Sequence, residues 1–450
     1  MEKTPQLCVM GGGLVGCLLS LYLAKQGYGV QVYERRPDLR RADLFSGRSI
    51  NLALSDRGWR ALETIGISED IKKVAMPMYR RVMHDGQGNL SFQPYGQAGQ
   101  AIYSVSRAGL NRALLNLAEA QPNISLNFEQ QVLEVDVPTN RVTMLNVASQ
   151  QEHQITPDVI FAADGAYSMV RLSLQKTDRF NFEQSYLNYG YKELTIPPAA
   201  DGTWQLEKNA LHIWPRGQYM MIALPNIDGS FTCTLFFPFE GEPSFKSLQT
   251  PAQVTSFFEE VFPDAVALMP ELAQEFFENP TGSLVTVKCF PWQHKGKILL
   301  LGDAAHAIVP FYGQGMNAGF EDCTVLRGLL ETHQNDWETI FNTFQEVRKP
   351  NTDAIADLAV YNFIEMRDKV ADPRFLLQKK IEAKITGQYP DAWLPLYSMV
   401  TFSPDLPYAQ ALANGQRQEE IMRQLMGHIE TEADYDKPQV QEFLKTHLSA

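Results

Sequence analysis

The chain has 450 residues, of which 44% are hydrophobic and 20% are charged. Its length exceeds the usual size of one domain, and its apolar content excludes a largely disordered protein. The formal net charge of −13 opposes binding to nucleic acid or to an anionic membrane. The five cysteines are scattered and include no C-x-x-C pair, so we expect no metal site and a reducing, cytoplasmic environment.

The first elements predict a strand–helix–strand unit. Residues 6–10 form a buried strand, 14–26 a helix with apolar residues at helical spacing, and 29–33 a second strand. The apolar run through this unit is nearly long enough to span a membrane, but the glycines at 11–13 would interrupt a spanning helix. We therefore interpret it as a βαβ unit of ordinary size.

The next elements predict mixed α/β structure. A helix is expected at 56–65, with Ser55 as its N-cap and Gly66 just after its end. A second helix is expected at 107–119, and four strands follow it. These strands cover 125–128, 132–137, 141–147 and 159–163.

Between about 180 and 290 the pattern changes to strands separated by Pro, Gly, Asn and Asp, which predicts a second, sheet-based unit. Its clearest strands lie at 186–194, 219–224 and 231–237. A buried strand at 298–301 returns to the first unit, and helices follow. These helices lie at 318–330, 337–349 and 352–365. Residues 414–450 are polar, with no apolar run long enough to cross lipid, so we expect no membrane anchor.

The segment 11–16 matches the G-x-G-x-x-G pattern through Gly11, Gly13 and Gly16. These glycines allow a tight turn, close approach of the backbone to a pyrophosphate and close helix–strand packing. The pyrophosphate then lies at a helix N-terminus, which favours an anion. Glu34 ends the second strand and is placed to bind ribose hydroxyls, and its carboxylate would repel the 2′-phosphate of NADP. The pattern therefore favours FAD or NAD over a glycine-rich turn without a ligand.

Two later segments resemble motifs of the class A flavoprotein monooxygenases. They are Ala163-Asp164-Gly165-Ala166-Tyr167-Ser168 and Leu301-Gly302-Asp303-Ala304-Ala305-His306. Taken singly, they are an Asp-Gly turn and an acid at a strand end. The resemblance implies that Asp303 binds the ribityl chain of FAD and that Asp164 contributes to FAD and pyridine nucleotide binding. It also implies cofactor contacts by Val15, Arg36, Ala53, Arg107, Val132, Gly315, Met316 and Asn317.

From about residue 5 to 405 the chain resembles the kynurenine 3-monooxygenase family. The most specific stretches are 47–55, 212–216, 231–236, 361–367 and 395–403. The resemblance implies that the substrate, L-kynurenine, is bound by Arg81, Tyr95, Asn362 and Tyr397. It further implies that Phe236, Phe237, Pro310 and Phe311 line the pocket for the aromatic ring. Membrane-bound members of the family end in an apolar anchor, from which the polar end of this chain departs.

The substrate contacts have a chemical reason and open alternatives. A carboxylate in a partly dry pocket is costly unless it is paired, and a planar guanidinium is a suitable partner. Arg80 is a rival to Arg81 for this role. By position alone, Arg81 could be a solvated strand residue, Tyr95 a loop aromatic and Tyr397 a core ring, and core packing explains Phe236 and Phe237 almost as well.

The resemblance implies an FAD-dependent monooxygenase that converts L-kynurenine to 3-hydroxykynurenine with NADPH and O₂ through a flavin hydroperoxide. FAD would be bound, and NADPH would be a transient co-substrate. Because the flavin carries the chemistry, neither a catalytic side chain nor a metal is expected. A hydroxylase for another aromatic substrate, a flavin-dependent dehydrogenase and a non-catalytic flavin-binding protein are the alternatives.

The elements and the resemblance together predict an α/β fold in three parts. The first is a discontinuous, Rossmann-like FAD-binding domain at 1–75, 99–180 and 290–345. The second is a β-sheet substrate domain at 76–98 and 181–289. The third is a C-terminal helical region at 346–450.

Overall fold

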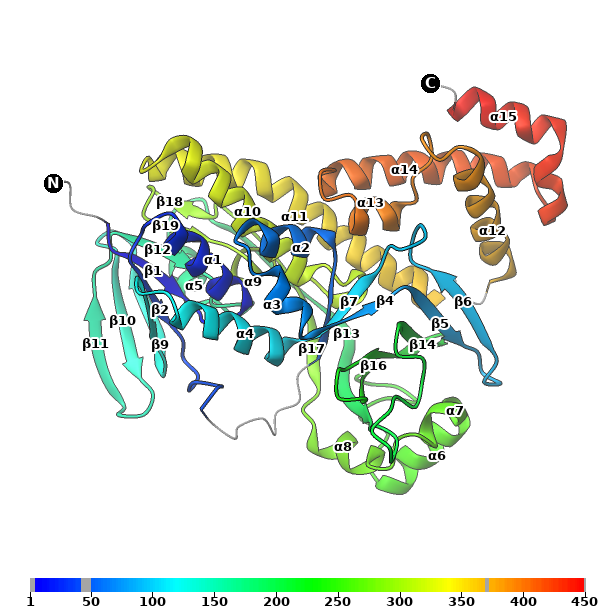
Figure 1. The fold of residues 1–450 in the computed structure, drawn as a ribbon, viewed down its shortest axis with the longest axis horizontal. Coiled ribbons are helices and arrows are strands. Elements are labelled where there is room, and N and C mark those ends of the chain that lie inside the picture. The colour runs from blue at the N-terminus through cyan, green and yellow to red at the C-terminus, as the bar shows by residue number, and fades with distance from the viewer. Residues whose placement is uncertain (1–4, 42–49, 369–371, 449–450) are drawn as a thin grey trace.

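The computed structural model describes residues 5–41, 50–368 and 372–448, which form four β-sheets and the helices around them (Figure 1). One sheet has the order β18-β19-β12-β1-β2-β8. Its strands are β1 (Leu7–Met10), β2 (Val30–Tyr33), β8 (Ile124–Asn127), β12 (Val159–Ala162), β18 (Gln293–His294) and β19 (Ile298–Leu300). β1 pairs in parallel with β2 and β12, and β12 in parallel with β19. Every residue of β1 is buried, as expected for a parallel strand covered on both faces.

Helices and two small sheets surround this sheet. α1 packs against α4 and α10, and α5 packs against β9. The small sheets have the orders β11-β10-β9 and β3-β7-β4. Their strands are β3 (Asn51–Leu54), β4 (Ala75–Met78), β7 (Ile102–Ser106), β9 (Gln130–Asp136), β10 (Arg141–Asn146) and β11 (Gln151–Ile155). The helices are α1 (Leu14–Lys25), α2 (Asp56–Thr64), α3 (Ser68–Lys72), α4 (Arg107–Glu119), α5 (Met169–Leu174) and α10 (Gly315–His333).

The largest sheet has the order β17-β13-β16-β15-β14-β5-β6. Its strands are β5 (Arg80–His84), β6 (Leu90–Pro94), β13 (Asn181–Ile196), β14 (Ala210–Arg216), β15 (Tyr219–Pro225), β16 (Phe231–Pro238) and β17 (Gly282–Phe290). β5 and β14 pair in parallel, whereas the other pairs are antiparallel. Three helices lie beside it, at the bottom of Figure 1: α6 (Pro251–Val261), α7 (Pro263–Val266) and α8 (Leu272–Glu278). Phenylalanines from both layers, such as Phe237 and Phe258, form an apolar core.

The rest of the chain is mostly helical. It contains α9 (Asp303–His306), η1 (Pro310–Tyr312), α11 (Trp337–Asp368), α12 (Pro373–Gln388), α13 (Leu396–Phe402), α14 (Tyr408–Leu425), η2 (Met426–His428), η3 (Glu432–Asp436) and α15 (Pro438–Leu448). α12, α14 and α15 share a core of their own around Ile385, Trp393 and Leu444, at the upper right of Figure 1. None of the helices in the described ranges combines the length and the apolar character needed to span a membrane.

The helix α11 corrects the sequence prediction of two helices. Pro350 lies between the two predicted ranges, and proline disfavours a helix interior because it lacks a backbone N–H and collides with the preceding turn. The structure instead continues as one helix with Pro350 inside it. Its two halves are each held by a core, the first through Phe341 and Phe344 and the second through Ile355 and Leu358. Packing on both sides of the proline therefore outweighs the local preference for a break.

The other predicted elements agree with the structure best in the first part of the chain. The strands and helices predicted up to residue 174 are present within two residues of their expected ends, and α4 has the predicted bounds. The helices α6, α7 and α8 were missed within the region interpreted as strands. Ser55 precedes α2, but its side chain makes no capping hydrogen bond; its backbone N–H instead donates to Asn317 Oδ1 at 3.0 Å. The three-part domain division stays a proposal, supported by the distribution of the two large sheets along the chain.

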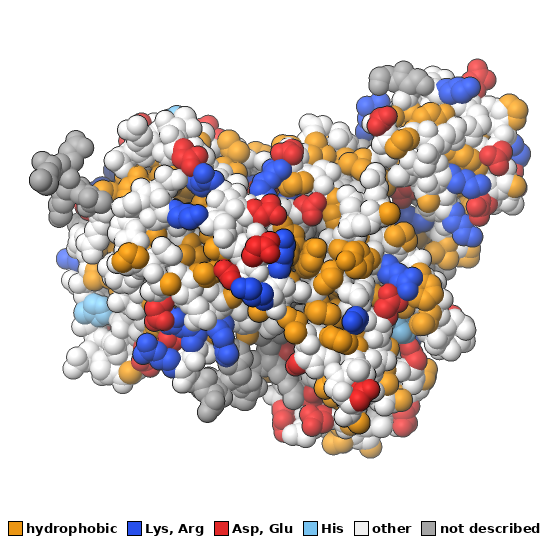
Figure 2. All heavy atoms as spheres, viewed as in Figure 1, with side chains coloured by type: hydrophobic (Ala, Val, Ile, Leu, Met, Phe, Trp, Pro, Cys, Tyr) orange, Lys and Arg blue, Asp and Glu red, His pale blue; other side chains and the backbone are white. Residues whose placement is uncertain are grey.

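Charge is spread over the face of the molecule seen in Figure 2. Figure 2 shows acidic and basic side chains interspersed over the visible face of the molecule. The net charge of −13 is therefore not gathered into one patch on that face.

Candidate functional site

The motif segments meet at one edge of the first sheet. The strands β2, β1, β12 and β19 are neighbours and run in parallel, so their carboxyl ends lie together. Gly11 follows β1, Glu34 follows β2, and Asp164 and Gly302 come shortly after β12 and β19. The chain crosses from β1 to β2 on one side, while β12 pairs on the other side. This is a topological switch point, where ligands bind in open α/β sheets.

Two of the three motif glycines in this turn are required by close packing, and the other faces open space. Gly11 has φ +105°, and a Cβ there would lie 2.4 Å from the carbonyl oxygen of Ala163. A Cβ on Gly16 would lie 1.9 Å from the carbonyl oxygen of Gly11. A Cβ on Gly13, by contrast, would have no heavy atom beyond its chain neighbours and the backbone of its own helix within 4 Å. The first and third glycines are therefore required by the protein itself, and the second faces space that fits a pyrophosphate.

Glu34 is held as a carboxylate beside this turn. Its Oε2 accepts a hydrogen bond from the N–H of Gly12 at 2.9 Å, and its Oε1 accepts from Arg36 Nε at 2.7 Å. Burial opposes ionisation, but the hydrogen bonds from Arg36 and Gly12 hold the pKa of Glu34 below its ordinary value. An ionised acceptor at this position fits a ribose hydroxyl.

Asp164 has one oxygen engaged and one free for a ligand. Its Oδ2 accepts from the N–H groups of Met169 and Val170 at 2.8 and 3.3 Å, at the start of α5. Its Oδ1 is buried and has no hydrogen-bond partner in the described part of the chain. Burial is the main cause that raises the pKa of Asp164. A buried acceptor without a donor is unfavourable, so this oxygen fits a hydroxyl or N–H of the cofactor.

The remaining cofactor candidates lie around the same edge or at its margins. Asp303 is exposed at the first residue of α9, and Arg107 is exposed at the first residue of α4. Val132, a residue of β9, has its side chain buried in the core. Val15, in the glycine turn, lies against Gly302, since a Cβ on Gly302 would be 3.1 Å from Val15 Cγ2. The glycine turn and the segment 301–306 are thus in contact.

A hydrogen-bonded loop leads into α10. Gly315 and Met316 begin this helix. Asn317 donates from Nδ2 to the carbonyl oxygens of Ala53 and Gly313, each at 2.8 Å. Its Oδ1 accepts from Ser55. The side chain of Asn317 therefore fixes the loop against β3, and it leaves cofactor contacts to the backbone of the helix start.

A second cluster surrounds Arg81. Its guanidinium carbon lies 4.7 Å from the ring centre of Tyr95 and 4.2 Å from that of Tyr397. The rings of Tyr95 and Tyr397 stack at 5.7 Å, and those of Tyr397 and Tyr312 at 5.6 Å. The hydroxyl of Tyr95 is buried and lies close to the guanidinium of Arg81, so its own proton is left to donate to a ligand. The cluster thus presents a cation and a phenolic O–H beside a wall of aromatic rings, a combination that fits a carboxylate.

Arg80 and Arg81 point to opposite faces of β5. Neighbouring residues of a strand point to opposite faces. Arg80 forms two hydrogen bonds to the carboxylate of Glu207, at 2.8 and 2.7 Å, and lies over the ring of Phe92. Arg80 is therefore engaged on the other face, and Arg81 is the guanidinium that faces Tyr397.

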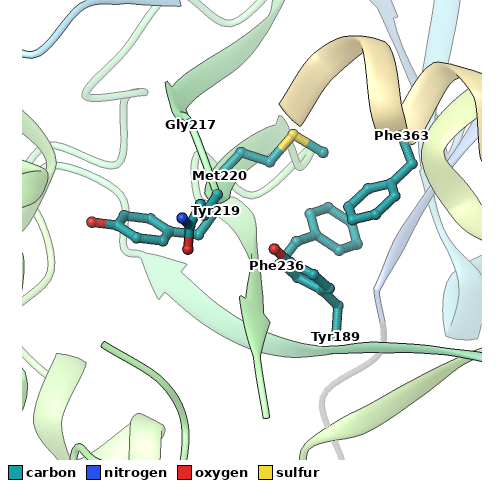
Figure 3. Close-up of a pocket in the computed structure, with 7 residues that line it drawn as sticks. Tyr189, Gly217, Tyr219, Met220, Phe236 and Phe363 are labelled. Carbon is teal, nitrogen blue, oxygen red and sulfur yellow. The ribbon is translucent and has the colours of Figure 1, made fainter. Parts of the chain in front are cut away.

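An aromatic group adjoins this cluster. The rings of Phe236 and Phe311 lie 4.8 Å apart, and those of Phe311 and Phe363 lie 4.5 Å apart. Figure 3 shows Phe236, Phe363 and Tyr189 gathered in a small pocket with Met220. Pro310, at the start of η1, is exposed. Asn362 donates from Nδ2 to the carbonyl oxygen of Phe311 at 2.6 Å. The apolar side of the site is thus built from β16, η1 and α11.

The position of Phe237 is a correction. It was expected to line the pocket with Phe236, but the two neighbours face opposite sides of β16. Phe237 is fully buried in the core under α6, with its ring 5.1 Å from Phe257 and 5.3 Å from Tyr219. Alternation of side chains along a strand is the reason. Phe237 therefore has a packing role.

Replacement of Phe237 by alanine tests this assignment. We expect a loss of about 3–5 kcal/mol of unfolding free energy, because a fully buried ring leaves a cavity. Denaturant unfolding of the FAD-loaded protein measures this loss. The apparent affinity for substrate in the remaining folded protein should be unchanged. A variant of normal stability with impaired substrate binding would place Phe237 in the pocket after all.

Comparison with known proteins identifies the family. A family model described as an FAD binding domain matches residues 4–225 and 271–359. The kynurenine 3-monooxygenase of Flavobacterium johnsoniae is 51% identical over 441 residues, which cover 98% of each chain. That of Dictyostelium discoideum is 46% identical over 93% of each chain. The chain belongs to the kynurenine 3-monooxygenase family.

Solved structures of lower identity share the fold of this family member. A tetrameric 2-methyl-3-hydroxypyridine-5-carboxylic acid oxygenase has a TM-score of 0.68 at 22% identity, covering 84% of this chain and 96% of that one. PqsL, a probable FAD-dependent monooxygenase from Pseudomonas aeruginosa, has a TM-score of 0.62 at 19% identity, covering 81% and 97%. The predicted fold class is therefore confirmed, and FAD is the cofactor.

Sequence reasoning missed some residues of the site in this family member. Phe363 lies within a segment that carried the resemblance, and Tyr312 directly follows Pro310 and Phe311, but neither was expected to contact the substrate cluster. Tyr189 and Met220 gave no signal beyond strand periodicity. Residues 47–49, the start of one segment of resemblance, lie outside the described residues.

Proposed function

We propose that the chain hydroxylates L-kynurenine at ring position 3, with bound FAD, NADPH and O₂, and that it does so at the Arg81 cluster. One observation supports the Arg81 cluster as the substrate site. Ala53, which accepts the hydrogen bond from Asn317 at the start of α10, also packs against the apolar group that contains Tyr95 and Tyr397. The cluster that fits a carboxylate therefore adjoins the loop that fits the flavin.

The cofactor-binding residues of this proposal surround the glycine turn. Gly11, Gly13 and Gly16 admit the pyrophosphate, Glu34 and Arg36 flank the ribose position, and the motif residues contact the rest of FAD. The other proposed contacts are Val15, Ala53, Arg107, Val132, Asp164, Asp303, Gly315, Met316 and Asn317. Bound FAD supplies the redox chemistry, since it accepts hydride from NADPH and activates O₂.

The substrate is held at both ends. Arg81 pairs with the carboxylate of the amino acid, and the hydroxyl of Tyr95 donates to it, with Tyr397 and Asn362 at its sides. Phe236 and Phe311 contact the aromatic ring and exclude water from it. The aniline nitrogen of kynurenine already donates electrons to its ring, so a dedicated general base is not needed. The protein's task is therefore orientation and exclusion of water.

A cytoplasmic location is part of this proposal.

Anaerobic reduction of the bound flavin tests the proposed function. NADPH is mixed with the oxidised protein in the absence and in the presence of L-kynurenine, and the loss of flavin absorbance is followed. We expect a large acceleration by L-kynurenine and a much smaller one by L-tyrosine or a simple phenol, because only the amino acid with an aniline ring fills both ends of the site. Incorporation of labelled oxygen from O₂ into the product then separates hydroxylation from dehydrogenation. Equal acceleration by all aromatic compounds would contradict the choice of substrate.

A further inference from the structure

Two buried histidines lie on the face of β5 and β14 opposite to Arg81, outside the proposed site. His84 Nδ1 is 2.6 Å from Asp264 Oδ2, and His84 Nε2 is 2.9 Å from His212 Nδ1. His212 Nε2 is 3.0 Å from the carbonyl oxygen of Glu207. His84 is 3% exposed and His212 is 2% exposed. Three successive contacts thus join α7, β5, β14 and the segment before β14, with both imidazoles buried and the Asp264 side chain 25% exposed.

The number of protons shared along these three contacts follows from the two groups at the ends of the series, Asp264 and the carbonyl of Glu207. A backbone carbonyl such as that of Glu207 can only accept a hydrogen bond. At the other end, Asp264 Oδ2 also accepts the indole N–H of Trp214 at 2.9 Å. Each of the three contacts needs one proton, but two neutral imidazoles carry only one each. Two protons would leave one contact with lone pairs facing each other at about 3 Å, so the geometry requires a third.

The third proton can lie on the carboxyl group or on an imidazole. Asp264 accepts two short contacts on the same oxygen, and hydrogen bonds from His84 and Trp214 outweigh burial and hold its pKa below the ordinary value. Burial lowers the pKa of His212 to about 4. His84 is the group in contact with the carboxylate, and its ring stacks on the indole of Trp214 at 4.1 Å, which favours a cation. The charge is therefore on His84.

Two other charged side chains, those of Arg216 and Glu207, lie near the histidines. Arg216 on β14 donates to the carbonyl oxygens of His84 and Asp85, and its positive charge faces Asp264. Glu207 pairs through its carboxylate with Arg80. Among the described residues, Asp264 is thus the negative group in direct contact with the histidines, and an imidazolium–carboxylate pair balances its charge.

We propose that the His84–His212 pair holds one extra proton, and that the resulting His84 imidazolium is a positioning residue for Arg81. The register places Arg81 opposite Leu211 and Val82 opposite His212 in the parallel β5–β14 pair. The histidine chain clamps these strands together on one face, while Arg81 projects from the other. Without the extra proton, two lone pairs would oppose each other and the clamp would weaken. Substrate affinity should fall with it.

Nuclear magnetic resonance of the full-length, FAD-loaded protein tests the proton count. With ¹⁵N-labelled histidine at neutral pH, we expect three protonated ring nitrogens and one unprotonated nitrogen from the pair, assigned with the H84Q and H212Q variants. Asp264→Asn removes the counter-ion and should lower the count to two. Glu207→Gln is the matched control, because it changes the side chain and leaves the backbone acceptor, so the count should stay at three. Two protonated and two bare nitrogens in the unaltered protein would overturn the proposal.

The effect on Arg81 is tested separately, and this part rests on the proposed function. His84→Gln should raise KM for L-kynurenine by at least about threefold with flavin content and kcat retained, as expected for a change that acts through another residue. A protein that has three protonated nitrogens but does not turn over kynurenine would refute the function and leave the proton count standing. An unchanged KM in H84Q, or a loss of kcat without a change in KM, would overturn the positioning role.

Discussion

Replacement of Gly13 by valine is expected to yield a folded protein that is isolated without its yellow cofactor. Beyond its own helix and chain neighbours, no heavy atom lies within 4 Å of a Cβ at this position, and the backbone at φ −76° and ψ −172° suits any residue. The valine side chain instead occupies the space of the pyrophosphate. Loss of two charge-assisted hydrogen bonds, each worth roughly 1.5–3 kcal/mol, should lower FAD affinity by at least about 100-fold. Flavin absorbance per protein and titration with FAD measure this.

Gly16→Val is the contrasting variant. A Cβ there would lie 1.9 Å from a backbone oxygen of Gly11 and 3.2 Å from Val9, so the turn itself must move. We expect this variant to lose thermal stability as well as FAD, whereas Gly13→Val keeps the unfolding behaviour of the apoprotein. A Gly13→Val protein with normal FAD content would exclude the glycine turn as the pyrophosphate site.

Much of the fold was predictable because its signals are local. β1 is a buried apolar run that ends at a glycine, and α4 has its N-cap Ser106 accepting from Gly109. Both can be inferred from neighbouring residues. β11 could not, because all but the last of its residues Gln151–Ile155 are polar and exposed, and the strand exists through its pairing with β10. The continuity of α11 across Pro350 likewise depends on packing by distant parts of the chain.

The candidate site divides in the same way. The motifs at the ends of β1, β12 and β19 meet because parallel strands share an edge, so their convergence follows from the predicted topology. The opposite orientation of Phe236 and Phe237 also follows from strand alternation, and that signal was available. The grouping of Arg81 with Tyr95 and Tyr397 was expected only through the resemblance, although Tyr95 directly follows the strand that pairs with β5. The stacking of Tyr312 on Tyr397 was not expected, because these two rings come from segments that are far apart in sequence and meet only in the folded protein.

Replacement of Arg81 by alanine is expected to lower kcat/KM for L-kynurenine by roughly 10- to 150-fold, the equivalent of one charge-assisted hydrogen bond of about 1.5–3 kcal/mol. The loss should appear mainly as a higher KM, since the guanidinium binds the carboxylate at a distance from the reacting ring. FAD content should be normal, because Arg81 contacts the tyrosine cluster and not the glycine turn. Steady-state NADPH oxidation and direct titration of flavin absorbance with L-kynurenine measure both quantities.

Arg80→Ala is the matched control one residue away. Its pair with Glu207 is partly exposed, at 44% and 34% for the two side chains, and such pairs contribute little because water screens them. We therefore expect little change in KM, in contrast to Arg81→Ala. Decarboxylated kynurenine sharpens the comparison, because it lacks the group that Arg81 binds and should react equally poorly with the unaltered protein and with Arg81→Ala. If Arg80→Ala impaired kynurenine binding and Arg81→Ala did not, the substrate would have to lie on the other face of β5.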